Sequence, residues 1–165
     1  MLIGIGIGGF IIFIFGFIGA VMVFLYFRHK KEAEESQNWA STLGTITKTY
    51  MRQEVSYETS NTIYYPTIEY EYEYRGVIHT GNRVNFGGSS GNSNYRKSEE
   101  ILAQYPINKT ITVYYDPNNP EEAVLEQKMG TGGKVMLIVG ILFAFIALCA
   151  ACVGSVLAIM AVMDN

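Results

Sequence analysis

Uncharged residues fill both ends of this chain, and polar and apolar residues alternate through its middle. Leu2 to Phe27 and Val135 to Met163 each lack a charged side chain. Both segments exceed the roughly 20 residues with which a helix crosses a bilayer core about 30 Å thick. A backbone in lipid must satisfy its own polar groups, as a helix does. The pattern therefore predicts two transmembrane helices, over 1–28 and 134–163.

The first apolar segment has one alternative interpretation, a cleaved signal peptide. That interpretation fits the residues poorly, because no basic residues precede the apolar run and the run is longer than a signal-peptide core. The segment also ends in Leu25-Tyr26-Phe27-Arg28 rather than in small residues. We therefore expect a retained helix.

Between the helices, the alternation is clearest over Thr67–Tyr74, where Ile and Tyr occupy one face and Thr and Glu the other. This pattern is typical of a half-buried strand. Arg75-Gly76 then interrupts it before Val77–Thr80, which predicts a hairpin whose turn uses Gly76 at positive φ. Further strands are predicted over Thr42–Tyr50, Gln53–Tyr57 and Thr110–Tyr115, which are rich in β-branched and aromatic residues. After a turn over Asp116–Pro120, order is expected to resume at Ala123–Glu126.

One short helix is predicted over Ser98–Gln104, with Ser98 or Asn94 near its N-cap and Glu99 and Glu100 near its positive end. The preceding stretch, Phe86–Asn94, has the composition of a flexible surface loop and lacks the pattern of a phosphate-binding loop. The predicted organisation is a juxtamembrane linker over 29–38, an extramembrane β-rich domain over 39–128 and a Gly-rich elbow over 129–133. The expected fold class is an α+β membrane protein in which two transmembrane helices flank a small antiparallel β-sandwich or barrel with one short helix.

The 12 Lys and Arg residues all lie between Arg28 and Lys134. Arg28, Lys30 and Lys31 directly follow the first apolar segment and Lys134 directly precedes the second, where positive charge resists translocation. We therefore expect a multi-pass plasma-membrane protein with a cytoplasmic β domain and both termini outside. An extracytoplasmic domain remains the alternative, because long loops can cross regardless of charge.

Composition argues against several kinds of chemistry. A net charge of −3 without a basic patch argues against a nucleic-acid partner. His29 and His79 are too few to build a zinc site with the cysteines. Cys149 and Cys152 have redox-pair spacing but lie within the second apolar segment, so they are interpreted as small apolar residues of a helix in lipid. We expect no catalytic residue, no metal ligand and no cofactor site.

Two kinds of contact surface are predicted instead. Glu69, Glu71 and Glu73 share one face of a strand and form an acidic stripe, which is either solvated, or a docking surface for a basic partner or a weak cation site. Tyr64 and Tyr65 are added to this surface, because exposed tyrosines favour protein recognition. Small residues that let helices approach closely in lipid recur at a spacing of about four: Gly4, Gly8, Gly140, Ala144, Ala147, Ala151, Gly154 and Ala158.

The order of features across the middle half of the chain is distinctive. The most specific element is Tyr114-Tyr115-Asp116-Pro117-Asn118-Asn119-Pro120, followed by Ala123-Val124-Leu125. Upstream lie Trp39, Thr42, Gly44, Ile46, the run Tyr64–Tyr72, Gly76, Gly81 and Tyr105-Pro106. The chain thereby resembles the bacterial membrane-protein family catalogued as domain of unknown function 3592. The resemblance implies a β domain beside or between transmembrane helices and carries no activity over to any residue. The loop Gly87–Asn94 is longer than the family pattern demands.

Three functions follow as hypotheses. The favoured one is a non-enzymatic, membrane-anchored interaction or scaffold module, or an accessory subunit of a membrane complex, with a protein partner or a second copy. The alternative is an enzyme acting on lipid or envelope material, which would need a pocket holding His79 with an acid and a hydroxyl. A channel or transport component is the second alternative, disfavoured because the apolar helices carry no ionisable residue to form a polar path.

Overall fold

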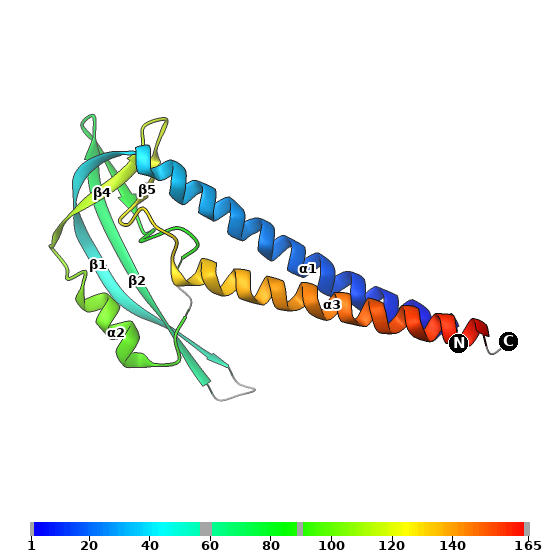
Figure 1. Ribbon diagram of the computed structural model, residues 1–165. Helices are drawn as coiled ribbons and strands as arrows, with labels where there is room; N and C mark the ends of the chain where they lie inside the picture. Colours follow the sequence, from blue (N-terminus) through cyan, green and yellow to red (C-terminus); the bar gives the residue numbers. More distant parts are fainter. Residues whose placement is uncertain (1, 57–60, 89–90, 164–165) are drawn as a thin grey trace. The chain divides into compact units, whose positions relative to one another are not determined.

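The computed structural model describes residues 2–56, 61–88 and 91–163 (Figure 1). Its helices are α1 (Leu2–Glu35), α2 (Tyr95–Ala103) and α3 (Thr131–Met163), with a short 3-10 turn, η1 (Ser36–Asn38), after α1. Its strands are β1 (Ala40–Ser56), β2 (Asn61–Tyr74), β3 (Val77–Gly81), β4 (Thr110–Asp116) and β5 (Asn119–Val124).

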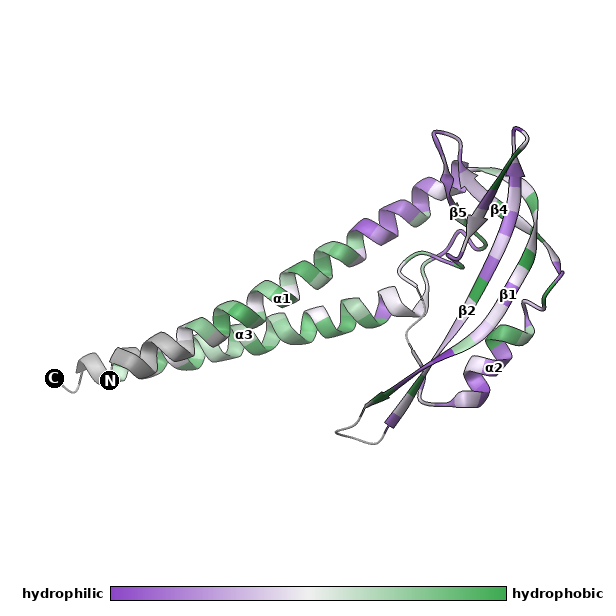
Figure 2. Ribbon diagram, turned by 180° about the vertical axis from the view of Figure 1, so that it is seen from behind, coloured by the Kyte–Doolittle hydropathy of each residue, from purple (hydrophilic) through white to green (hydrophobic). Residues whose placement is uncertain are grey.

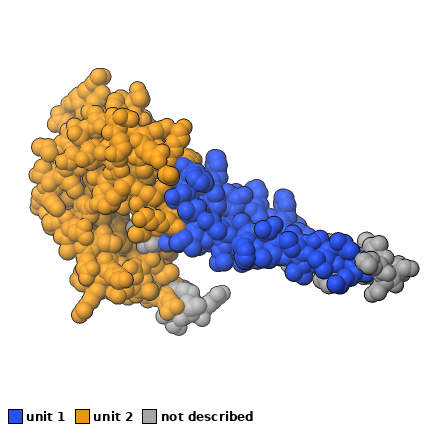
Figure 3. All heavy atoms as spheres, viewed as in Figure 1, with its two compact units in different colours: residues 1–27, 135–165 blue, residues 28–134 orange. Residues whose placement is uncertain are grey.

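The chain divides into two compact units (Figure 3). One unit joins Met1–Phe27 to Val135–Asn165, and the other is the continuous segment Arg28–Lys134. The divisions fall where the charge pattern changes, since Arg28 and Lys134 are the first and last cationic residues of the chain.

The apolar parts of α1 and α3 form the first unit, and their described residues are mostly hydrophobic (Figure 2). Two segments, Ile12–Asn38 and Thr131–Val156, are long and apolar enough to cross a membrane, although the apolar part of the first ends at Phe27. The two helices approach most closely at glycines. A Cβ atom on Gly19 would lie 2.9 Å from the carbonyl oxygen of Gly140, so a larger residue there would force the helices apart.

The second unit is built on one antiparallel sheet of five strands in the order β3-β2-β1-β4-β5. Strand β1 is central and unusually long. It joins the two strands predicted over Thr42–Tyr50 and Gln53–Tyr57, because Met51 and Arg52 continue the pairing opposite Pro66 and Tyr65. A register shift between Ile46 and Lys48 bulges β1. Tyr57 lies outside the described residues.

The hairpin turns agree with the predicted positions. Arg75 and Gly76 join β2 to β3 with φ values of 51° and 79°, so the prediction of a positive φ at Gly76 is confirmed. Pro117 and Asn118 join β4 to β5, and the Asn118 N–H donates to Asp116 Oδ1 at 2.8 Å. Strand β5 begins at Asn119, earlier than the expected Ala123, because the turn needs only two residues.

Helix α2 begins at Tyr95, three residues before the predicted start. Asn94 holds the N-cap position without a side-chain cap hydrogen bond. Ser98 is not the cap. Ser98 lies within α2, its side chain is fully buried, and its Oγ donates to the Tyr64 carbonyl at 3.4 Å. Glu99 and Glu100 consequently fall beyond the first turn, and the expected stabilisation of the helix dipole by acids there is wrong.

The main core lies on one face of the sheet, where α2 contributes partly buried Ile101 and Leu102. Alternation places Ile68, Tyr70 and Tyr72 of β2 in this core. The other buried members are Ile46, Tyr105, Val113, Ala123 and Leu125. A second, smaller core joins Ala33, Phe86 and Val124, with Trp39 packed edge-on at 5.7 Å from the Phe86 ring.

Backbone pairing continues beyond the edge strands. The amides of Leu125 and Glu126 donate to the carbonyls of Arg83 and Val84 at 3.3 and 2.7 Å, so the segments after β3 and β5 hold each other. The described strands form one curved sheet rather than the two facing sheets of a sandwich. The predicted elbow is also hydrogen-bonded, because the amides of Gly130 and Gly132 donate to the carbonyls of Phe86 and Gly88.

Candidate functional site

The predicted acidic stripe lies on the face of β2 opposite the main core. Glu71 and Glu73 are exposed, whereas Glu69 is half-buried and already paired. The Glu69 carboxylate accepts from Lys48 Nζ at 3.0 Å and from the Tyr50 hydroxyl at 3.3 Å. The hydrogen bond and the charge of Glu69 raise the pKa of Lys48, with further electrostatic contributions from Tyr50 and Glu71. Only two of the three carboxylates are therefore free of an ion pair with any described residue.

The stripe is flanked by two exposed apolar side chains that the sequence prediction did not include. Ile78 of β3 pairs directly with Glu73 and is 70% exposed. Leu43 of β1 is 69% exposed, and it shares the face of Thr45, which pairs with Glu71. Leu43 and Ile78 lie on other strands than the glutamates, so the sequence alone does not reveal that they are neighbours. Their proximity follows only from the strand register. We call Leu43, Glu71, Glu73 and Ile78 the outer-face patch.

Tyr64 and Tyr65 do not join this patch. Tyr64 is half-buried against α2, where its ring meets Tyr95 edge-on at 5.2 Å. Tyr65 is half-buried too, with the Arg52 guanidinium 4.9 Å from its ring centroid. Both tyrosines are therefore engaged within the domain.

The predicted helix-packing residues fall into three groups. Gly140 and Ala147 are buried, and the backbone of Ala144 would lie 3.0 Å from a Cβ on Gly19. Ala151 and Gly154 are exposed, with nothing within 4 Å of a Cβ at Gly154. The surroundings of Gly4, Gly8 and Ala158 lie outside the described residues. Gly19 was not on the predicted list, although it lies in the apolar run.

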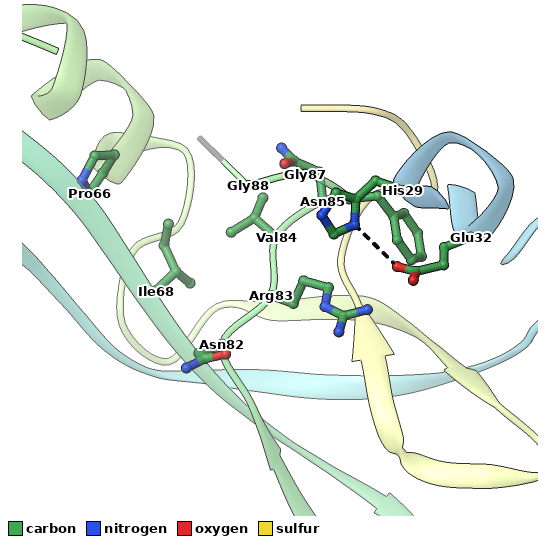
Figure 4. Close-up of a pocket in the computed structure, with 11 residues that line it drawn as sticks. His29, Glu32, Pro66, Ile68, Asn82, Arg83, Val84, Asn85, Gly87 and Gly88 are labelled. Carbon is green, nitrogen blue, oxygen red and sulfur yellow. Dashed lines mark hydrogen bonds and ion pairs between the residues drawn. The ribbon is translucent and has the colours of Figure 1, made fainter. Parts of the chain in front are cut away.

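A pocket of about 360 Å³ lies within the second unit, between the charged end of α1 and the segment 82–88 (Figure 4). His29 and Glu32 line it from α1, with Nδ1 and Oε2 3.3 Å apart. Arg83 and Asn85 face them from the loop, above a floor of Ile68 and Val84. Among the described residues that line it, none is Ser, Thr or Cys.

Glu32 is the acidic residue among the described lining of this pocket, and Arg83 is basic. Partial burial raises its pKa, but hydrogen bonds from Arg28, at 2.9 Å, and from His29 outweigh the burial, so that the net shift is downward. Glu32 is therefore a carboxylate at neutral pH. The residue lies five positions beyond Phe27, where the apolar run ends.

The other candidate residues are separate from this pocket. His79 stacks on Tyr72 at 5.6 Å between ring centroids and does not line it. Cys149 and Cys152 are free and exposed on α3. Among the described residues, no group of three His, Cys, Asp or Glu side chains is placed to hold a metal ion.

Residues 42–130 match the family described as Domain of unknown function (DUF3592). The chain belongs to the DUF3592 family. The match runs from Thr42 in β1 to Gly130, just before α3, so it covers α2 and the sheet except for Ala40 and Ser41 of β1. The predicted resemblance is thereby confirmed. No curated protein and no solved structure matches the chain.

The DUF3592 match includes the outer-face patch and the loop side of the pocket, but it excludes His29 and Glu32. The pocket thus combines residues of the DUF3592 domain with residues from the preceding helix. The motifs that identify the family, such as the Tyr114–Pro120 segment, build β4 and its turn rather than the pocket.

Proposed function

We propose that this protein is a non-enzymatic interaction module, anchored in the membrane by α1 and α3, whose β domain binds a basic partner protein through the outer-face patch. The observation that supports this proposal is the combination of two exposed apolar side chains, Leu43 and Ile78, with the carboxylates of Glu71 and Glu73, which form no ion pair with any described residue. Apolar contacts supply affinity, and the carboxylates select a positively charged surface.

A different protein is a better partner for this patch than a second copy. In a two-fold symmetric contact the same patch would face itself, which would bring like carboxylates together. Like charges across an interface oppose association. The acidic character of the patch therefore supports a hetero-complex, consistent with a role as an accessory subunit of a membrane complex.

The lengths and hydropathy of α1 and α3 support insertion into the plasma membrane. Arg28, Lys30, Lys31 and Lys134 border the two apolar runs, which favours a cytoplasmic β domain with both termini outside. In this orientation the outer-face patch faces cytoplasmic partners.

The test is extraction of the tagged full chain in a mild detergent, followed by measurement of the protein that co-purifies. Glu71→Lys with Glu73→Lys reverses the charge of the patch, and recovery of the partner should fall by about tenfold or more. Glu99→Lys with Glu100→Lys makes the same charge change on the exposed side of α2 and should leave recovery unchanged.

Equal recovery with both double variants would show that the patch does not bind the partner. A chain that purifies alone from native membranes would also contradict the proposal. Thermal unfolding of each variant checks that the β domain remains folded, since exposed substitutions of this kind normally change stability by less than about 0.5 kcal/mol.

The pocket beside His29 does not favour the enzyme alternative. A covalent hydrolytic mechanism needs a nucleophile next to the base. The lining residues that the structure describes supply an imidazole and a carboxylate but no hydroxyl or thiol. The arrangement fits ligand binding better than bond cleavage.

A further inference from the structure

A second pocket, of about 420 Å³, lies beside the first in the β domain. The two share one wall, made of Pro66, Ile68, Val84 and Asn85. Its remaining lining residues come from the end of α2 and from the segment 126–134. We call it the elbow pocket, because this segment leads directly into the apolar part of α3.

The floor of the elbow pocket is apolar. Ile101 and Tyr105 line it opposite Ile68 and Val84, with Met129 on the side of the elbow. Ile68 and Tyr105 belong to the main core, and Val84 and Ile101 pack against it. Such a floor accepts the hydrocarbon part of a ligand.

The rim of the elbow pocket carries cations. Lys128 and Lys134 both line it and both are exposed. Lys128 forms an ion pair with Glu126, with Nζ 3.2 Å from Oε2. Lys134 makes no ion pair with any described residue. Glu126 is the one carboxylate among the described lining residues, and it also accepts from the Tyr105 hydroxyl at 3.2 Å. Two ammonium groups therefore face one carboxylate, which leaves the rim positive.

The shared wall contains an incompletely satisfied amide. Asn85 Oδ1 is buried and makes no hydrogen bond with any described residue. A buried acceptor of this kind calls for a donor from water or a ligand. A ligand that offers a hydroxyl group beside its anionic group would meet this need.

We infer that the elbow pocket binds the headgroup of an anionic phospholipid, with the phosphate between Lys128 and Lys134 and an apolar portion over the floor. Lys134 immediately precedes the apolar run that begins at Val135, so the rim lies at the membrane surface once α3 is inserted. Lysines at this position attract anionic lipids. The inference rests on the membrane anchoring that is part of the proposed function.

The test uses the purified full chain in neutral detergent, titrated with phosphatidylglycerol or phosphatidylcholine and followed by native mass spectrometry. Phosphatidylglycerol should bind more tightly than phosphatidylcholine. Lys128→Gln with Lys134→Gln should weaken phosphatidylglycerol binding about 30-fold, because each of the two lysines near an anionic lipid surface contributes about 1 kcal/mol. Arg96→Gln with Lys97→Gln removes two exposed cations from α2 and should leave binding unchanged.

Competition separates the two sources of a phosphate group. Millimolar inorganic phosphate and deacylated glycerophosphoglycerol should not displace the lipid, because neither covers the apolar floor. Equal binding of these free anions and of the lipid would overturn the lipid assignment. Equal lipid binding by the two double variants would overturn the site.

Fractionation of cells distinguishes this inference from the proposed function. If the chain is recovered with membranes but the Lys128→Gln/Lys134→Gln variant still binds phosphatidylglycerol normally, the elbow pocket is refuted and the membrane anchoring is not. A chain recovered in the soluble fraction refutes both.

Discussion

Three tyrosine hydroxyl groups are held inside the β domain by specific acceptors. Tyr70 donates to the Arg83 carbonyl at 3.0 Å, Tyr72 to the Pro120 carbonyl and Tyr105 to Glu126 Oε1 at 3.2 Å. Burial raises the pKa of all three phenols, and the neighbouring Glu126 helps to raise that of Tyr105 to about 12. Each tyrosine therefore folds as the neutral phenol.

These raised pKa values predict that the β domain loses stability in alkali. An unfolded tyrosine ionises near pH 10, so the stabilisation is complete below that pH and is lost as pH rises through about 12, the folded value for Tyr105. The urea midpoint should fall between pH 10 and 12. The fall should be shallower in Tyr105→Phe, while the exposed Tyr95→Phe should follow the wild type. Parallel curves for all three proteins would contradict this assignment.

The sequence indicated the burial of Tyr70 and Tyr72 through strict alternation with glutamate, and both are buried as that alternation requires. It did not reveal Gly19 or Gly130, because a glycine's need for space depends on what approaches it. A Cβ on Gly130 would lie 2.1 Å from Asn85 Oδ1, a neighbour 45 positions earlier in the chain. Long-range proximity of this kind has no local sequence signal.

At the scale of single elements, local chemistry predicted the turns better than the limits of strands and helices. Arg75-Gly76 and Asp116–Asn119 contain residues with strong turn preferences, and both are turns. The prediction divided β1 in two and left out Met51 and Arg52, since it rested on β-branched and aromatic residues and these two are neither. Pairing with β2 includes both in one strand. The early start of α2 was missed for a related reason, since Tyr95 and Ser98 gain their helical positions by packing against Tyr64.

The β2–β3 turn gives a test with adjacent positions. Gly76→Ala places a Cβ on a backbone with φ of 79°, which should cost about 1–2 kcal/mol of unfolding free energy. Arg75→Asn, at φ of 51°, removes a residue that tolerates this region poorly and also removes the cation over the Tyr74 ring. These effects oppose each other, so its stability should change by less than about 0.5 kcal/mol. Denaturant titration measures both, and equal losses would contradict the role of Gly76.

At the scale of the whole molecule, the two units were visible as a change of pattern. The uncharged runs form α1 and α3, and the charged middle forms the β domain. The pockets could not be predicted, because they are assembled from α1, β2, the segment 82–88 and the segment after β5. The acidic stripe was predicted from one strand, whereas its apolar neighbours Leu43 and Ile78 required the order of the sheet.

The proposed orientation makes a prediction for intact cells. In a chain carrying Cys149→Ala and Cys152→Ala, a cysteine introduced as Asn118→Cys lies in the exposed turn between β4 and β5. A membrane-impermeant maleimide should label it only after the cells are permeabilised. A cysteine introduced instead as Asn165→Cys should be labelled in intact cells. The reverse result would place the β domain outside.

The central position of β1 affects how the protein folds during its synthesis on the ribosome. Strand β1 needs β2 on one side and β4 on the other, and β4 does not begin until Thr110, more than fifty residues after β1 ends at Ser56. During translation, the Ala40–Thr45 segment of β1 therefore lacks its β4 partner after α1 and the rest of β1 have been made. Until β4 emerges, that open edge is a target for chaperones, and a pause in synthesis before Thr110 would prolong the exposure.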